Sequence, residues 1–286
     1  MNVAIITDSS ACLPKELVEK YEIEIVPLDL IHEGKVYKDG IDITSAEFYK
    51  LLSQAKELPT TSAPSPGDYF EVFKKVAEKA ENILVVTPSA KFTHAFDSAK
   101  KAVEMAKDKL RDVAVEVLDS GTAAGAQGFV VLAAAKAAAF SESLVRVIEA
   151  ARNLMPKVYL VAIIDTLHYL AKGGRVPQIA AWASSLLKIK PLFELLPLSK
   201  GVTSVDRVRT RPKAIERLAE FLRERVDRKP VHAVVMHTNA LDEAEKLKER
   251  IISEFNCVEV YVEDFTPVMG VHTGPGLLGV AFYTED

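Results

Sequence analysis

The first half of this chain alternates short apolar runs with longer amphipathic or alanine-rich stretches, and that alternation constrains the fold more than any other feature. Residues 3–7 predict a buried strand, a short helix opens near Pro14, and residues 23–30 predict a second strand. Strand–helix–strand order is typical of a parallel sheet with helices on its faces, so this half predicts a three-layer α/β/α domain. The order continues with strands at 83–86 and 113–118 and helices at 96–110, 123–140 and 141–155.

A second unit begins with a predicted strand at residues 158–164. We place the domain boundary near residue 156, so that residues 1–156 and 157–286 form two α/β domains. In the second domain we expect further strands at 192–196, 203–208, 231–236, 258–262 and 277–283, and helices at about 177–187, 211–225 and 241–255.

Turn and capping residues mark three places in the first domain. Glu33–Gly34 predicts a hairpin, and Thr44 followed by Glu47 predicts a capping box ahead of a helix. Residues 58–66 contain three prolines and four hydroxyl side chains, which leaves no room for regular structure. We expect that segment to be an ordered or functional loop.

The charge balance excludes several classes of partner. The 286 residues include 36 Lys and Arg against 40 Asp and Glu, which gives a net charge of -4 and a pI near 6.0. A dedicated nucleic-acid or anionic-membrane surface would need a strong basic excess. The partner is therefore expected to be a small molecule or another protein.

No segment predicts secretion or membrane insertion. The N-terminus lacks the basic region and long apolar run of a signal peptide, and Cys12 and Cys257 lie far apart in the sequence. The most apolar stretch, residues 125–140, is interrupted by Gln127 and Lys136 and is shorter than the ~18 apolar residues of a membrane helix. We expect a soluble, cytoplasmic protein with reduced thiols.

The familiar patterns of catalysis and nucleotide binding are weak in this sequence. Residues 274–279 spell GxGxxG, but the segment after them predicts a strand, where a dinucleotide site needs a helix. There is no P-loop pattern, and the histidines have no metal-ligand spacing. A Ser/His/Asp hydrolase can be assembled from Ser9 or Ser120, His272 and Asp8 or Asp119, yet no Gly-x-Ser-x-Gly elbow presents a nucleophile.

Polar loops at the ends of apolar elements remain as candidate ligand-binding sites. The hydroxyls at 60–62 and 87–93 are placed either to cap helices or to bind a ligand. Residues 172–175 deliver an arginine from a glycine turn, and residues 270–276 combine turn residues with His272. The residues alone indicate a small-molecule or anion site made of hydroxyls, one arginine and one histidine.

Six short motifs follow one another along the whole chain. They are TDSS at 7–10, TSAPS at 61–65, LHYLAKGGR at 167–175, KIKP at 188–191, RVRTRPKA at 207–214 and HTGPG at 272–276. Through these motifs the chain resembles the DegV family, the bacterial fatty-acid-binding proteins that present a fatty acid to a fatty acid kinase.

That resemblance implies an N-terminal three-layer α/β/α domain with a parallel sheet and a C-terminal two-layer α/β domain with a mixed sheet. It also implies a tunnel between them for a fatty acid of about C14–C18, such as palmitate, whose carboxylate is presented to an ATP-dependent kinase. The protein would then be a non-catalytic carrier without metal or cofactor. Neither a nucleic-acid partner nor stable membrane insertion is expected.

The resemblance also assigns a carboxylate site. Thr61 and Thr93 would hydrogen-bond the carboxylate, and Arg175 and His272 would flank it. The surrounding loops would contribute Ser62, His94, Gly174, Thr273 and Gly274. The chain departs from the family pattern S-x-K-L-S-G-T-Y at His94 and Ala95, which replace Gly and Thr. A Cβ at position 94 limits positive φ, and the loss of a hydroxyl at position 95 removes one possible donor.

Two other functions stay open at this point. A hydrolase or phosphoryl-handling enzyme could use His272 with Thr or Ser hydroxyls, and a lipid-dependent sensor could control docking to another protein. The alanine-rich helix at 123–140 would either leave room for a lipid tail or pack closely against a sheet.

Overall fold

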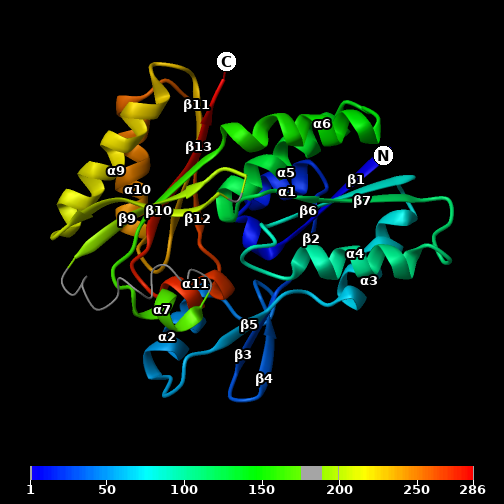
Figure 1. Ribbon diagram of the computed structural model, residues 1–286, viewed down its shortest axis with the longest axis horizontal. Coiled ribbons are helices and arrows are strands. Elements are labelled where there is room, and N and C mark those ends of the chain that lie inside the picture. The colour runs from blue at the N-terminus through cyan, green and yellow to red at the C-terminus, as the bar shows by residue number, and fades with distance from the viewer. Residues whose placement is uncertain (1, 175–188, 199, 286) are drawn as a thin grey trace.

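The computed structural model describes residues 2–174, 189–198 and 200–285, and these residues form three sheets (Figure 1). The first sheet has the strand order β2-β1-β6-β7, and all of its pairs are parallel. Its strands are β1 (Val3–Asp8), β2 (Glu24–Val26), β6 (Asn82–Thr87) and β7 (Ala114–Asp119). The predicted parallel sheet is confirmed.

Helices cover both faces of this sheet because successive strand residues point to opposite sides. Ala4 and Ile6 of β1 pack with α3 (Pro66–Ala77) and α4 (Ala95–Ala106). Val3 and Ile5 belong to a separate cluster on the other face. That face is covered by α1 (Lys15–Lys20), α5 (Ala124–Ala139) and α6 (Leu144–Leu154). The result is the three-layer α/β/α arrangement.

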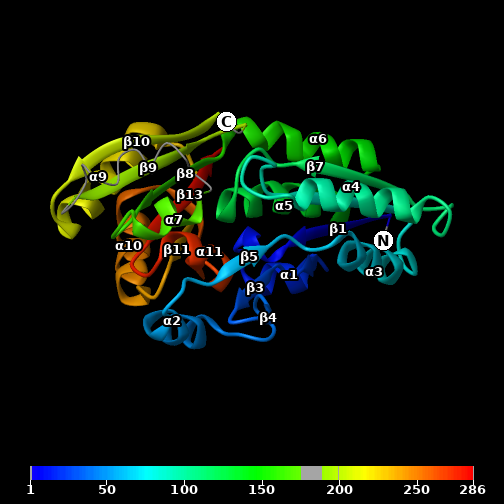
Figure 2. The same ribbon diagram turned by 60° about the horizontal axis from the view of Figure 1, so that its bottom comes forward.

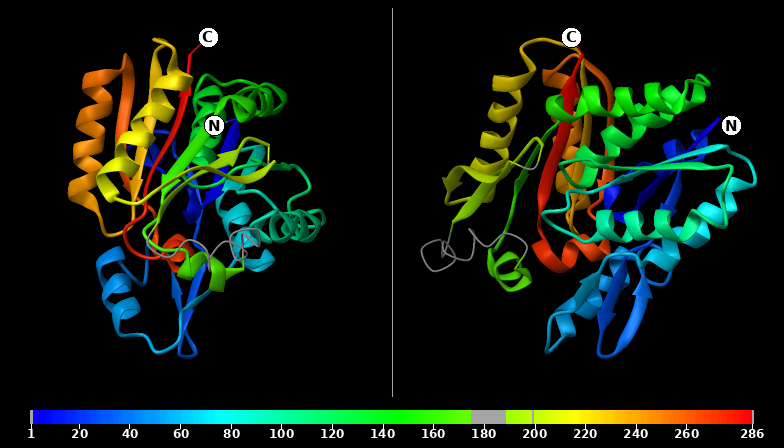
Figure 3. Two further views of the ribbon diagram at one scale, coloured as in Figure 1. Left: turned by 60° about the vertical axis from the view of Figure 1, so that its left-hand side comes forward. Right: turned by 45° about the vertical axis from the view of Figure 1, so that its right-hand side comes forward.

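The second sheet is mixed and has the order β10-β9-β8-β13-β11-β12, in which only the β11–β12 pair is parallel. Its strands are β8 (Tyr159–Ile163), β9 (Lys190–Leu196), β10 (Gly201–Val208), β11 (Val231–His237), β12 (Cys257–Asp264) and β13 (Leu278–Thr284). Helices α9 (Arg211–Val226) and α10 (Leu241–Glu254) cover its outer face, away from the parallel sheet (Figure 3).

Helix α5 lies between the two large sheets and is buried on both sides. Its residues share one apolar cluster with β1 and β6 of the parallel sheet and with β8, β9, β11 and β13 of the mixed sheet. Small residues permit this close approach: a Cβ added at Gly125 would collide with Val234, and one at Gly128 would lie 2.6 Å from the Ala11 carbonyl oxygen. Most of this alanine-rich helix therefore packs closely against the sheets.

A small third sheet joins the lower side of the molecule (Figure 2). It consists of β4 (Lys35–Lys38), β3 (Asp29–His32) and β5 (Thr60–Ser62), all antiparallel neighbours. The remaining short elements are α2 (Ser45–Gln54), α7 (His168–Gly173), α11 (Pro267–Thr273) and the 3-10 turns η1 (Ser9–Ala11) and η2 (Met155–Lys157). The predicted hairpin at Glu33–Gly34 and the Thr44–Glu47 capping box are both present.

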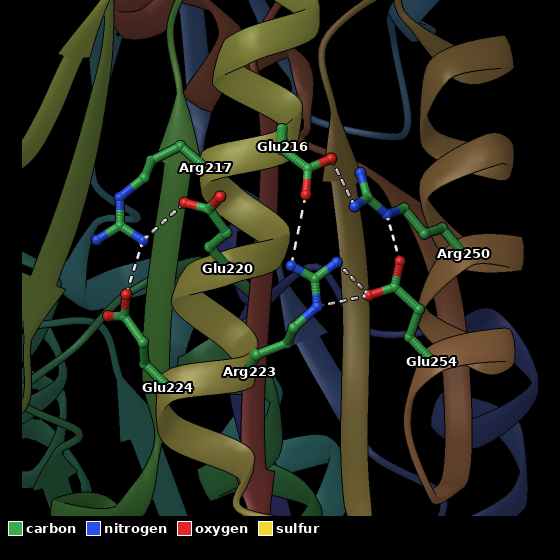
Figure 4. Close-up of polar contacts among 7 residues, drawn as sticks. All are labelled: Glu216, Arg217, Glu220, Arg223, Glu224, Arg250 and Glu254. Carbon is green, nitrogen blue, oxygen red and sulfur yellow. Dashed lines mark hydrogen bonds and ion pairs between the residues drawn. The ribbon is translucent and has the colours of Figure 1, made fainter.

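Helices α9 and α10 are held side by side by a ring of ion pairs (Figure 4). Arg250 contacts both Glu216 and Glu254, at 2.7 and 2.6 Å. Arg223 contacts the same two carboxylates, at 3.4 and 2.7 Å. Each partly exposed pair contributes little by itself, about 0–1 kcal/mol, so the ring mainly fixes how the two helices are aligned.

Two predictions for the first domain, one of a strand and one of a loop, were wrong in detail. The single strand predicted at 23–30 is interrupted by Pro27, which has no N–H to donate to a ladder, and β2 and β3 belong to different sheets. Residues 58–66 are not free of regular structure. Thr60–Ser62 pairs with β3, because the prolines at 59 and 64 lie outside the three paired residues.

Three helical segments also differ from the sequence prediction. Helix α3 was not predicted, although Ser65 and Asp68 form a capping box around Pro66. The described part of the segment 172–175 is not a simple turn, because Lys172 and Gly173 end α7 and Gly174 follows as a left-handed C-cap. Likewise Gly270 to Thr273 form the end of α11. The helix predicted at 177–187 lies outside the described residues.

Within the described ranges, no helix has the length and apolar character needed to cross a membrane.

Candidate functional site

The main candidate site is a cavity of about 910 Å³ at the carboxyl ends of β1 and β6. Ser10, which lies just beyond β1, and Pro88, which follows β6, both line it. In the order β2-β1-β6-β7 the chain leaves β1 toward one edge of the sheet and β6 toward the other. Open α/β sheets bind ligands at such a point, because the loops diverge there and leave a crevice.

A buried polar network lies behind Ser10 at the wall of this crevice. The Ser10 hydroxyl donates to Asp8 Oδ1 at 2.5 Å, and the Gln127 amide donates to Thr7 Oγ1 at 3.0 Å. Burial raises the pKa of Asp8 to about 6, although hydrogen bonds from Ser10 oppose that shift. The network holds Ser10 at the cavity wall and ties the end of β1 to α5.

Thr61 and His272 come together at one end of the cavity. Strand β5 pairs with β3, where Thr61 lies opposite Leu30, and β5 also contacts α11. Thr61 Oγ1 is 2.9 Å from His272 Nε2, and both residues line the cavity. When the imidazole carries its proton on Nε2, it donates to Thr61 Oγ1, and the Thr61 hydroxyl proton is then available to an anionic ligand.

Thr93 also lines the cavity, just ahead of α4. Its Oγ1 accepts a hydrogen bond from the Ala95 N–H at 3.3 Å, so the hydroxyl does serve the start of this helix. A hydroxyl that accepts one bond still has its own proton to donate. Capping and ligand binding are therefore compatible at Thr93.

The departure at His94 is accommodated without strain. His94 has φ -88°, which any L-residue adopts, so its Cβ meets no backbone conflict. Its side chain is 90% exposed, and Nδ1 lies 3.5 Å from Asp97 Oδ2. His94 therefore lies at the open side of the cavity.

The other predicted site residues divide into three groups. Ser62, Gly174 and Thr273 line the cavity with Thr61, Thr93, His94 and His272. Gly274 is not part of the lining. It has φ 69° and would place a Cβ against the Tyr169 ring, so it serves the packing of α11 on α7. Arg175 lies outside the described residues.

Much of the rest of the lining is apolar. Three of its residues come from the inner face of the mixed sheet: Leu160 of β8, Leu195 of β9 and Val202 of β10. Other apolar lining residues are Phe92, Ala123, Ala124, Leu170, Phe265, Val268 and Met269. Only the beginning of α5 reaches the cavity, through Ala123 and Ala124.

Sequence reasoning missed five polar lining residues: Ser10, Asp29, Ser65, Lys91 and Ser98. Lys91 brings a cation to the loop that holds Thr93, and its position two residues before Thr93 was the available signal. The carboxylate of Asp29 pairs with Lys38 Nζ at 2.8 Å. That pairing reduces the repulsion that Asp29 would exert on an anionic ligand.

A second, open cleft of about 950 Å³ lies at the ends of β11 and β12. Its one arginine, Arg211, contacts Glu243 at 2.7 Å and Asp165 at 3.0 Å. Burial and the neighbouring Asp264 raise the pKa of Glu263 to about 7. The acidic lining residues are Asp165, Asp242, Glu243, Glu245, Glu263 and Asp264. Such a cleft disfavours an anion, so the first cavity is the better candidate for a carboxylate.

Neither serine proposed for a Ser/His/Asp hydrolase, Ser9 or Ser120, forms such a site with His272. Ser9 Oγ donates to Asp39 at 2.7 Å, and Ser120 is buried and contacts the Thr122 carbonyl oxygen. The hydroxyl beside His272 belongs to Thr61 instead. Among the described residues, no group of His, Cys, Asp and Glu side chains is arranged to hold a metal ion.

Comparison with known proteins identifies the family and supports the fold. The model of the family described as "Uncharacterised protein, DegV family" matches residues 2–285. A DegV domain-containing protein of Clostridium perfringens is 34% identical over 288 residues, which cover 100% of each chain. A solved DegV family protein from Thermus thermophilus, reported for its fatty acid binding, superposes with a TM-score of 0.91 at 28% identity, covering 100% of both chains. DegV of Bacillus subtilis, reported as a fatty acid binding protein, gives 0.89 at 30% identity, also over 100% of both chains.

Proposed function

The chain belongs to the DegV family, and on that basis we propose that it binds one long-chain fatty acid of about C14–C18 in the cavity between the parallel and mixed sheets. The observation that carries this proposal is the polarity of the cavity. The Thr61 hydroxyl and the His272 imidazole lie 2.9 Å apart in the lining, and the inner face of the mixed sheet supplies apolar residues to the same cavity. This combination matches a ligand with one carboxylate and a long alkyl chain.

The apolar chain supplies most of the binding free energy in this proposal. A C16 acid has about 14 methylenes, and at ~0.8 kcal/mol for each buried methylene their transfer contributes on the order of 11 kcal/mol. Ordering the chain and fixing the complex oppose part of that gain. The remaining binding free energy would be about 8 kcal/mol in favour of the complex, which corresponds to a Kd of ~1 μM. The cavity volume of about 910 Å³ lies in the range of small-molecule sites.

Neutral donors would orient the carboxylate rather than bind it tightly. Thr61 and Thr93 donate hydroxyl protons, His272 lies beside Thr61, and Lys91 contributes a positive charge to the same lining. Arg175, which follows Gly174 in sequence, would add a second charge. Hydrogen bonds to an ionised acceptor are shorter and about twice as strong as neutral ones, so a few suffice to fix the head group.

We further propose that the bound carboxylate is phosphorylated by a separate ATP-dependent fatty acid kinase in the cytoplasm. His94 and Lys91 lie on the open side of the cavity, next to Thr93, where a partner can reach the head group. An acyl-phosphate carries more negative charge than a carboxylate, and the nearby cations would accommodate it. This chain would act as carrier, and the kinase would supply the nucleotide chemistry.

The head-group assignment is tested by changing Thr61 and Thr93 to Val together. Valine keeps the shape of threonine but removes the hydroxyl, so we expect palmitate affinity to fall at least about tenfold, as for the loss of one hydrogen bond to a charged group. Isothermal titration with palmitate measures the effect.

The matched control is Thr60→Val. Thr60 is the exposed neighbour of Thr61 on β5 and does not line the cavity, so its loss should leave affinity unchanged. Unchanged affinity in the double variant would refute the assignment. Turnover of an acyl ester or acyl-phosphate by the isolated chain, abolished in His272→Ala, would favour the enzyme alternative.

A further inference from the structure

A buried carboxylate, Asp39, joins three segments that surround the cavity. Asp39 directly follows β4 and is 2% exposed. Its Oδ2 accepts the Ser9 hydroxyl at 2.7 Å, and its Oδ1 accepts the backbone N–H of Val268 at 3.3 Å. Ser9 in turn accepts the Leu28 N–H at 3.2 Å. One side chain therefore connects the end of β1, the start of β3 and the first turn of α11.

The contact at Val268 matters because of what α11 carries. Val268 and His272 are four residues apart on α11, so they lie on one face of that helix, and both line the cavity. Thr61 Oγ1 is 2.9 Å from His272 Nε2. A displacement of the first turn would thus move His272 relative to Thr61.

The helix also has polar contacts near its C-terminal end, where His272 meets Thr61 and Thr238 Oγ1 donates to the Gly274 carbonyl oxygen at 2.7 Å. Its contacts with α2 and α7 are matters of packing. A Cβ at Gly270 would lie 2.5 Å from Tyr49 Oη of α2, and Gly173 of α7 lies against the His272 ring. These close approaches fix how near α11 sits to its neighbours. They do not fix its position along its own axis, since apolar surfaces have no directional preference. The bond from Val268 to Asp39 is directional, and it acts on the end of the helix.

We propose that Asp39 is a positioning residue that sets α11, and through it His272, against Thr61 at the head-group end of the cavity. Asp39 does not line the cavity and would not touch a bound ligand. Its effect on fatty-acid affinity rests on the proposed function, whereas its effect on His272 does not. The two can therefore be tested separately.

The first measurement is the NMR signal of the His272 imidazole in the ligand-free protein, assigned with His272→Gln. In Asp39→Asn the side chain keeps its size, but an NH2 donor replaces one of the two oxygens that accept from Ser9 and Val268, so one of the two bonds loses its acceptor. We expect the His272 signal to shift and palmitate affinity to fall about tenfold. Ser9→Ala, which removes only one partner of Asp39, should shift the signal in the same direction and weaken affinity a few-fold.

Glu254→Gln is the matched control. Glu254 accepts hydrogen bonds from Arg223 at 2.7 Å and from Arg250 at 2.6 Å, so like Asp39 it joins separate segments, but it holds α9 against α10 and does not touch α11. We expect it to lower stability without moving the His272 signal or the affinity. An unmoved His272 signal in both Asp39→Asn and Ser9→Ala, or an equal shift in Glu254→Gln, would overturn the proposal. Failure of the wild type to bind palmitate would count against the proposed function and leave the His272 test standing.

Discussion

Single residues at the polar end of the cavity depend on elements that lie far apart in the sequence. Thr61 is placed by a three-residue strand, Thr93 by the start of α4, and His272 by the last turn of α11. Each contributes a neutral or weakly basic group, so orientation comes from their combination. This explains why the buried partners behind them, Asp8 and Asp39, matter to the site although neither lines the cavity.

A histidine with two carboxylate partners lies at the end of the mixed sheet where β11 begins. His232 is placed between two carboxylates, with Nδ1 2.7 Å from Glu259 and Nε2 3.1 Å from Glu285. Burial opposes the charged imidazole, but these hydrogen bonds outweigh it and raise the pKa of His232 above 6.5. The hydrogen bond from His232 lowers the pKa of Glu259 to about 2.

The sign of the two shifts defines a pH window. A raised histidine pKa stabilises the fold fully below pH 6.5, and that contribution is lost as pH rises through the folded-state pKa. A lowered glutamate pKa stabilises the fold above pH 4.5, and that contribution is lost as pH falls toward 2. Both contributions are fully present between about pH 4.5 and 6.5.

We predict that Glu259→Gln lowers the free energy of unfolding by about 2 kcal/mol at pH 5.5, the cost of losing a hydrogen bond between charged partners. At pH 9 the loss should be smaller, since the contribution of the charged imidazole declines as pH rises through the folded-state pKa. Urea unfolding at the two pH values measures this. Glu104→Gln, which breaks an exposed pair with Lys107, serves as control and should cost less than about 0.5 kcal/mol at both. An equal loss at both pH values in Glu259→Gln would contradict the assignment.

At the scale of elements, α5 has the strictest packing requirement. It lies between two sheets, and Gly125 faces Val234, Met236 and Ala281 of the mixed sheet. Even a methyl group at Gly125 would have to displace one of these neighbours. Close packing in this helix is therefore set by backbone approach rather than by large side chains.

We predict that Gly125→Ala lowers the free energy of unfolding by about 1–3 kcal/mol, the usual cost of overpacking a core. The control is Gly67→Ala in the first turn of α3, where the nearest atom, Ser65 Oγ, is 3.5 Å away. That change should be neutral or stabilising by up to ~1 kcal/mol, because alanine favours helix. Urea denaturation compares the two, and a destabilisation of equal size at both positions would contradict this account of α5.

Elements with strong local signals were predictable from the sequence, and those fixed by distant contacts were not. The β1, β6 and β11 strands are continuous apolar runs, and the Thr44 capping box is local by nature. Strand β5 exists only because β3 offers an edge to Thr60–Ser62. Helix α11 contains two residues that also favour turns, Gly270 and Pro267, and its contacts with α2 and α7 decide the outcome.

The same distinction applies to the candidate site. Family motifs were sufficient to single out Thr61, Thr93 and His272 as candidates, and all three line one cavity. The apolar lining could not be predicted from the sequence, since Leu160, Leu195 and Val202 look like ordinary strand residues there. Only the packing of the mixed sheet across the end of α5 brings them to the cavity.

At the scale of the whole molecule, the two sheets share a core through α5, and the cavity opens where that shared core ends. We propose residue 156, within η2, as the domain boundary, because it separates α6 from β8. The apolar cluster around α5 nevertheless draws on residues from both sides of that boundary. A ligand in the cavity would contact both halves and add to the surface that joins them.

The central claim is that the cavity holds a long-chain fatty acid, and the most direct measurement is mass spectrometry of lipid released when the protein, purified from bacterial cells, is denatured. We predict about one C14–C18 acid per chain, and a higher melting temperature when palmitate is added to lipid-free protein. Absence of any such acid, together with an unchanged melting temperature in palmitate, would contradict it.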